Sequence, residues 1–187
     1  MNWHLADFLR RVYRSGIGGV FYGRTYSRAH EKSMTAYEEG NPRQIQHSLK
    51  VHSFARLIGE SEELDAHALF TLEAAAVVHD VGIKAANEKF GHCTGKLQEQ
   101  EGPAPARAMM EELGFEEDVI ERVCYLVAHH HTYEPVDGMD YRILLEADYL
   151  VNLYEDGSSV ETIRNVLEQV FRTETGIWLC KTMFGVE

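Results

Sequence analysis

Apolar residues recur along this chain at the three- and four-residue spacing of helices, whereas the two-residue alternation of strands does not recur. His47, Val51, Phe54 and Ile58, for example, share one helical face. The pattern predicts an all-α fold, a single-domain helical bundle. Its helices are predicted at about residues 3–13, 27–38, 43–58, 62–81, 103–113, 116–130, 140–151, 158–172 and 175–184.

Polar, glycine and proline residues mark where these helices begin and end. Ser61 is expected to cap the helix that ends at Gly82, and residues 83–100 are expected to form a polar loop. The other boundary signals are Pro103 and Gly114 at the two ends of one helix, Asp140 as the cap of another, and Ser158 with Glu161 as a capping box.

The chain is expected to fold as one domain with three parts. Residues 1–42 form an N-terminal helix and an irregular arm, residues 43–155 form the main body, and residues 156–187 supply helices that complete it. The arm is rich in aromatic residues and is expected to pack on the core. A homodimer surface or a lid are the alternatives for this arm.

Composition and charge narrow the class of protein. An apolar fraction of 44% is ordinary for a globular chain of 187 residues, and no apolar run is long enough to span a bilayer. The net charge of −12 argues against a nucleic-acid partner, which normally selects a basic surface. The first residues lack the pattern of a signal peptide, so a cytoplasmic protein without a membrane partner is expected.

The main candidate for chemistry is the pair His79-Asp80, which follows an apolar run. His47 and Asp148 lie on the apolar faces of two further predicted helices. Burying a carboxylate such as Asp148 without a partner leaves roughly several kcal/mol of desolvation uncompensated. One divalent cation held by two imidazoles and two carboxylates compensates all four residues. This mixed nitrogen and oxygen set favours Mn, Fe, Co, Ni or Zn.

Each of these residues also has an ordinary structural interpretation. His47 fits a hydrogen-bonded core histidine, and Asp148 fits a helix cap or a partner of Arg56. His79 and Asp80 fit a coupled pair at a helix end, where the helix dipole favours the imidazolium. The coincidence of all four on three separate helices favours the metal site.

Three short segments contain these residues: Arg43–Leu49, Ala76–Gly82 and Glu146–Leu150. In this order, over about residues 43–155, the chain resembles the HD-domain superfamily of metal-dependent phosphohydrolases. The resemblance implies a helical bundle of the HD-domain type. It also implies that the primary metal ligands are His47, His79, Asp80 and Asp148.

Some members of that superfamily hold two ions and have extra histidines between the HD pair and the last aspartate. The segment with His129, His130 and His131 lies where those histidines occur. His130 shares a helical face with Val123 and Leu126, so it is expected to point inward with His129 beside it. His131 is expected on the substrate or solvent side. A polar helix end without an ion is the alternative.

Two-metal relatives often have a histidine just before a Gly-Pro helix start, and this chain has Glu101 there. Glu101 is therefore predicted to join His129 and His130 around a second ion, or simply to favour the N-terminus of the next helix. His92 in the preceding segment is a further candidate. One ion is predicted, and two are the alternative.

The resemblance implies metal-assisted hydrolysis of a small phosphate ester or anhydride, for which a nucleotide is the expected class. A bound ion would activate water and polarise a phosphoryl oxygen. Asp80 is predicted to bridge two ions or to orient the water, and Arg43 and Lys84 to contact phosphate. Lys84 is otherwise a solvated lysine. His129 or His131 is predicted to act as a general acid, with His131 on the substrate side.

Two other functions fit the same motifs. HD-type proteins that hold two irons include oxygenases, and the histidine-rich helix end is compatible with that chemistry. A non-catalytic HD domain that binds a nucleotide is the second alternative. Iron content with oxygen consumption would distinguish the first, and ligand-induced stabilisation without turnover the second.

Overall fold

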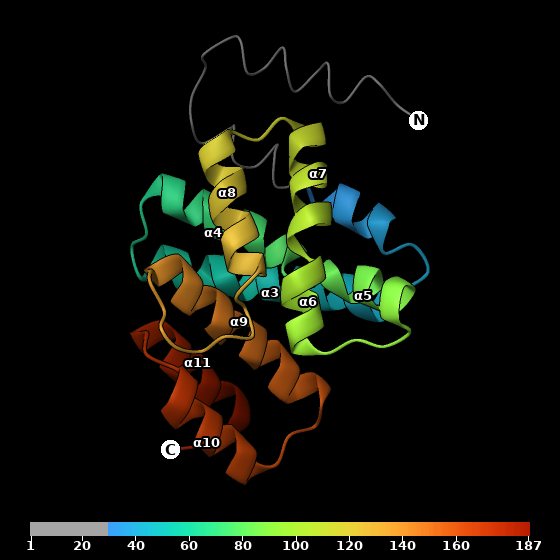
Figure 1. Cartoon of the computed structure of the whole chain (residues 1–187). Coiled ribbons are helices and arrows are strands. Elements are labelled where there is room, and N and C mark those ends of the chain that lie inside the picture. The colour runs from blue at the N-terminus through green and yellow to red at the C-terminus, as the bar shows by residue number, and fades with distance from the viewer. Residues whose placement is uncertain (1–29) are drawn as a thin grey trace.

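The computed structural model describes residues 30–187, and within that range it contains helices and no strand (Figure 1). The all-α prediction is confirmed. The helix predicted at residues 3–13 and the arm up to residue 29 lie outside the described residues. Residues 30–37 are helical, followed by α3 (Pro42–Ser61), α4 (Ala66–Val78), α5 (Gly82–Phe90), α6 (Gly95–Glu101), α7 (Pro103–Leu113), α8 (Glu117–Val127), α9 (Met139–Glu155), α10 (Val160–Val170) and α11 (Glu174–Phe184).

Helices α3, α4 and α9 form the centre of the fold. Helix α3 packs against both α4 and α9, and α4 also packs against α8 (Figure 1). The last turns of α4, residues 74–78, are buried on every side, which explains why this segment is an uninterrupted apolar run. The helix therefore ends inside the protein and delivers the residues that follow it to the interior.

The boundaries of α4 differ from the predicted ones. The predicted cap, Ser61, is the last residue of α3, and its hydroxyl donates to the carbonyl of Leu57 at 2.8 Å. Asp65 caps α4 instead, since its carboxylate accepts from the backbone N–H groups of His67 and Ala68, both at 2.9 Å. Gly82 does not end α4 but begins α5, after a turn at residues 79–81.

The predicted polar loop at residues 83–100 is also wrong, because most of it is helical in α5 and α6. Gly91 ends α5 in the left-handed conformation, and the hydroxyl of Thr94 caps α6 by accepting from the N–H of Leu97 at 3.3 Å. Both helices are short, with nine and seven residues. Helix α5 has only Ile83, Ala86 and Phe90 on its apolar face and α6 has only Leu97, which is too few turns for the periodicity on which the prediction depended.

Other boundaries moved by a few residues. Pro103 and Gly114 flank α7 as predicted, but α8 ends at Val127 and does not continue to residue 130. Asp140 lies inside the first turn of α9, where it binds Arg122 and does not cap the helix. Ser159, one residue after the predicted Ser158, caps α10.

The C-terminal helices α10 and α11 pack on α9. The fully buried carboxylate of Glu146 on α9 accepts from the backbone N–H groups of Arg172 and Thr173, at 2.7 and 3.0 Å, and from the Thr173 hydroxyl. Gly176 leaves room for that carboxylate, because a Cβ there would collide with it. A buried charge at the start of α11 thus fixes the end of the chain on the core.

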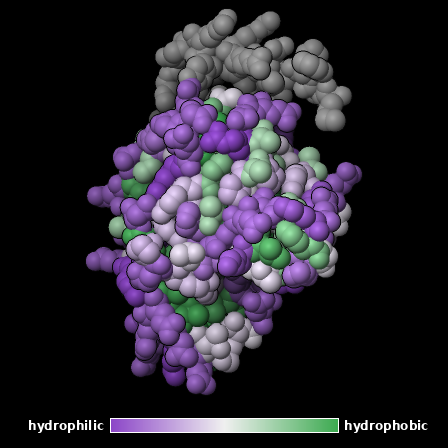
Figure 2. Space-filling model, viewed as in Figure 1, coloured by the Kyte–Doolittle hydropathy of each residue, from purple (hydrophilic) through white to green (hydrophobic). Residues whose placement is uncertain are grey.

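The surface and the interior differ sharply in polarity. Figure 2 shows a mostly hydrophilic face with several small hydrophobic areas, the lowest of them towards the C-terminal helices. By length and composition alone, the stretch Ala66–Phe90 could cross a membrane, but 61% of its most apolar window is buried inside the fold. That burial is what a core helix shows.

Candidate metal centre

Four polar side chains from three parts of the fold meet in the interior. His47 comes from α3, His79 and Asp80 from the turn after α4, and Asp148 from α9; none is more than 8% exposed. The two Nε2 atoms of His47 and His79 lie 3.2 Å apart. Asp148 Oδ1 lies 3.1 and 3.4 Å from these nitrogens, and Asp80 Oδ2 lies 3.4 and 3.5 Å from them.

On each of the two histidines, Nδ1 faces a hydrogen-bond acceptor and Nε2 faces the centre of the group. His79 Nδ1–H donates to the carbonyl of Ala76 at 3.0 Å, and His47 Nδ1–H donates to Glu155 Oε2 at 3.2 Å. When each imidazole is neutral, its one N–H is on Nδ1 and its Nε2 has a lone pair for a cation. The two Nε2 atoms point at each other and at two carboxylates, which fits a shared cation.

The spacing of these atoms also fits a metal ion. Ligand atoms at about 2.0–2.2 Å from one ion lie about 3.0–3.5 Å from each other. The five distances between the histidine nitrogens and their neighbours, 3.1–3.5 Å, fall in that range. The residues present therefore fit a divalent ion of the nitrogen- and oxygen-binding kind.

The pKa values of His79 and Asp80 also show that the site favours positive charge. Burial lowers the pKa of His79, but the charge of Asp80 and the hydrogen bond to Asp148 outweigh it and raise this pKa to about 9. Burial raises the pKa of Asp80, but His79 and His130 more than offset it, so the pKa lies well below its usual value. Both carboxylates are therefore ionised, and without an ion His79 carries a proton, whose positive charge a bound metal ion would replace.

A second group of side chains lies on the other oxygen of Asp80. His130, which is 1% exposed, places Nε2 3.4 Å from Asp80 Oδ1, and His131 completes a set of three potential ligands. Gln98 Oε1 lies 3.3 Å from His130 Nε2 and 2.7 Å from His131 Nε2. His130 Nδ1–H donates to the Val127 carbonyl at 2.8 Å, so its Nε2 is the nitrogen that faces Asp80 and Gln98. Asp80 thus joins both groups.

The segment with the three histidines is held from two sides. Tyr141 donates its hydroxyl to the carbonyls of His129, at 2.6 Å, and Thr132. Glu99 Oε1 accepts from the backbone N–H of His131 at 3.0 Å and from the Thr132 hydroxyl at 2.9 Å. These contacts determine the direction in which His130 and His131 leave the end of α8.

We expect Tyr141→Phe to destabilise the protein by about 1–2 kcal/mol, because two carbonyls lose their shared donor. At about 2–4 °C per kcal/mol, the melting temperature should fall by about 2–8 °C. Tyr154→Phe is the matched control, since Tyr154 is 69% exposed. Equal melting temperatures for the two variants would show that the Tyr141 hydroxyl does not hold the histidine segment in place.

Comparison with known proteins gives a family. The family model of the HD domain matches residues 45–162, which is more than half of the chain. The matched segment runs from α3 to the first turn of α10. The chain belongs to the HD-domain family. The matched region of this HD domain contains both groups of side chains around Asp80. Neither the curated proteins nor the solved structures gave a match.

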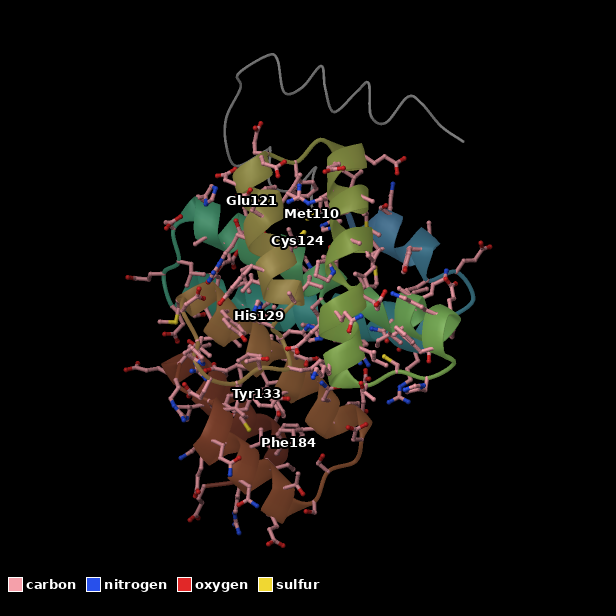
Figure 3. The ribbon with its side chains drawn as sticks, viewed as in Figure 1. Met110, Glu121, Cys124, His129, Tyr133 and Phe184 are labelled. Atoms are coloured by element: carbon pink, nitrogen blue, oxygen red, sulfur yellow. The ribbon has the colours of Figure 1, made fainter. Side chains whose placement is uncertain are left out.

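The HD domain does not bring all the predicted residues together. Glu101 binds Lys89 through both carboxylate oxygens, at 2.8 and 3.0 Å. His129 donates from Nδ1 to the Tyr125 carbonyl at 2.7 Å and stacks on the Tyr125 ring; Figure 3 shows it at the end of α8. Within residues 30–187, neither belongs to a group of potential ligands, and His131 stands beside His130 instead.

The two predicted phosphate-binding cations differ in their placement. Lys84 donates to the carbonyl of Tyr37 at 2.6 Å and lies over the ring of Tyr37, and it does not line the pocket beside the first group. The exposed Arg43 lines a pocket beside the first group and lies 3.7 Å from Asp156. His92, the further candidate, is exposed and faces the Phe90 carbonyl.

This pocket has a volume of about 320 Å³, at the low end of the range for small-molecule sites. It is lined by three of the four potential ligands of the first group, His47, Asp80 and Asp148. Its other lining residues are polar except for one: Asn41, Arg43, Gln44, Ile83, Gln98, His131, Asn152 and Glu155. A small polar molecule can therefore reach the ionised carboxylates.

Four further residues contact the potential ligands and were not predicted from the sequence. Gln44 donates from Nε2 to Asp80 Oδ2 at 2.9 Å, and Asn152 donates from Nδ2 to Asp148 Oδ1 at 2.9 Å. Gln98 contacts the second group, and Glu155 contacts His47. Part of this was readable, because Asn152 and Glu155 follow Asp148 by four and seven positions and so share its helical face.

Proposed function

We propose that this HD domain is a metal-dependent phosphohydrolase, which cleaves an ester or anhydride bond of a small phosphorylated molecule, with a nucleotide as the predicted class. One observation carries the proposal: the Nε2 atoms of two buried histidines, His47 and His79, converge with two ionised carboxylates beside a polar pocket. Members of the HD-domain family are typically metal-dependent hydrolases.

Under this proposal, the first ion is held by His47, His79, Asp80 and Asp148. A second ion, if bound, is held by Asp80, His130 and His131. A divalent ion here supplies positive charge that polarises a phosphoryl oxygen and acidifies a water molecule. The side chains of the pocket would bind the substrate and orient the water.

Asp80 orients the attacking water by accepting a hydrogen bond from it, and Gln44 holds the Asp80 carboxylate in place. Arg43, at the rim, binds the phosphate with its guanidinium. Burial and the neighbouring His130 lower the pKa of His131 to about 4, so this imidazole is neutral near pH 7. It contributes as a hydrogen-bonding group on the substrate side.

The proposal is tested by removing and restoring metal. We expect chelator-treated protein to hydrolyse none of a panel of nucleotides, sugar phosphates and p-nitrophenyl phosphate. Re-addition of Mn²⁺, Co²⁺, Ni²⁺, Fe²⁺ or Zn²⁺ should restore turnover. An ion present at 100 times its Kd should also stabilise the fold by about 2.7 kcal/mol, measurable by thermal unfolding.

Metal content and turnover are read separately in this experiment. Protein that retains no metal after purification and hydrolyses no substrate with any ion would contradict the proposal. Iron-dependent oxygen consumption without phosphate release would favour the oxygenase chemistry instead.

A further inference from the structure

Glu155, the last residue of α9, lies between a potential metal ligand and a lysine. Its Oε2 accepts from His47 Nδ1–H at 3.2 Å, and its Oε1 accepts from Lys50 Nζ at 2.8 Å. The side chain of Glu155 is only 11% exposed, whereas that of Lys50 is 39% exposed. Both contacts connect α9 to α3, since His47 and Lys50 are neighbours one turn apart on α3.

His47 differs from the other two inward histidines in how its ring is held. His79 and His130 each donate from Nδ1 to the backbone carbonyl three residues earlier, Ala76 and Val127. Those acceptors are fixed by the local backbone. The acceptor for His47 is a side chain from another helix. The direction of its Nε2 therefore depends on a group that a substitution can remove.

We propose that Glu155 is a positioning residue, which fixes His47 with Nε2 toward Asp80 and Asp148, and that Lys50 fixes Glu155. The inference rests on the proposed metal site. A carboxylate on the far nitrogen of a histidine orients the ring and makes the other nitrogen a stronger metal ligand. Such outer partners typically change metal affinity by about 10–100-fold.

The first test is the affinity of the full chain for Co²⁺ and Zn²⁺, measured by calorimetric titration and, for Co²⁺, by its visible absorption. We expect Glu155→Gln to raise Kd by about 10–100-fold and to change the Co²⁺ spectrum. Glu155→Asp, which keeps the charge, should recover part of the affinity. The melting temperature of the metal-free variants should stay near that of the wild type.

Glu117→Gln is the matched control. Glu117 on α8 binds Arg107 on α7 at 2.7 Å, so it also forms an ion pair between helices, but it belongs to neither group of potential ligands. We expect its metal Kd to stay within twofold of wild type. Glu155→Gln that binds metal as tightly as this control would overturn the proposal, and so would a loss of affinity that merely follows unfolding.

The role of Lys50 is tested by a double-mutant cycle. We expect Lys50→Ala to raise Kd by about threefold or more in the wild type and to have no further effect in Glu155→Gln, because it acts only through that carboxylate. Additive effects of the two substitutions would overturn the assignment of Lys50.

These outcomes are separable from those of the proposed function. Affinity that falls in Glu155→Gln, in a protein that hydrolyses no phosphate, supports the positioning role and contradicts the hydrolase. Wild-type protein that binds neither ion contradicts both.

Discussion

Replacing Asp80 with alanine is expected to lower kcat/KM for phosphate hydrolysis by at least about 10³-fold, equivalent to roughly 4 kcal/mol of transition-state stabilisation. The reason is the position of this residue, whose two oxygens face different groups. Oδ2 approaches His47 and His79, and Oδ1 approaches His130. One substitution thus removes a potential ligand from both groups.

The expected result extends to metal content. Alanine leaves His130 without its negative partner, His79 with Asp148 alone, and Gln44 without its acceptor. Removing one member of a buried charged pair typically costs about 3–5 kcal/mol, so Asp80→Ala is expected to be less stable as well. Asp80→Asn keeps the shape without the charge, and it should fold while binding metal much more weakly.

Metal per chain after dialysis and steady-state kinetics under one metal condition check this prediction. Asp118→Asn is the control, because the exposed Asp118 pairs with His67 and belongs to neither group of potential ligands, so both quantities should stay unchanged. A folded Asp80→Asn that keeps wild-type turnover would show that the chemistry does not pass through this carboxylate.

The sequence was most informative where the chain is most buried. His47 and Asp148 were found because each interrupts the apolar face of a long helix, and a buried polar residue needs a partner. The predicted helices α3 and α9 have nearly the observed limits in that region. Burial leaves a readable pattern, so the three parts of the chain that supply the first group could be identified.

The second group was harder to predict because it depends on local turns. Extending α8 to His130 placed His129 beside it, but the helix ends at Val127 and the following residues turn. The turn brings His131 to Gln98. Gln98 lies on the short helix α6, which has no apolar stripe from which it could be predicted. Glu101 was predicted from the resemblance, and no helix face in the sequence required it.

Gly82 gives the sharpest remaining example, and Gly82→Ala is expected to destabilise the protein by about 1–3 kcal/mol. The sequence suggested a helix stop, but the structure shows a close approach of backbones. A Cβ at this position would overlap the carbonyl oxygen of Gln98 and lie 2.9 Å from the amide nitrogen of Gly102. Backbone atoms cannot move aside as a flexible side chain can, so α6 must shift away from α5.

Whether Gly82→Ala raises or lowers the stability of the protein tests the close approach of α5 and α6. In a helix without such a neighbour, alanine in place of glycine stabilises by about 0.5–1 kcal/mol. Gly91→Ala is the control, because a Cβ there meets nothing within 4 Å and only the left-handed φ of 74° is strained. We expect Gly82→Ala to lose more stability than Gly91→Ala in denaturant unfolding, and to weaken any binding of a second ion, since α6 positions Gln98 beside His130 and His131. A Gly82→Ala variant as stable as the wild type would mean that α5 and α6 are not packed backbone to backbone at the metal centre.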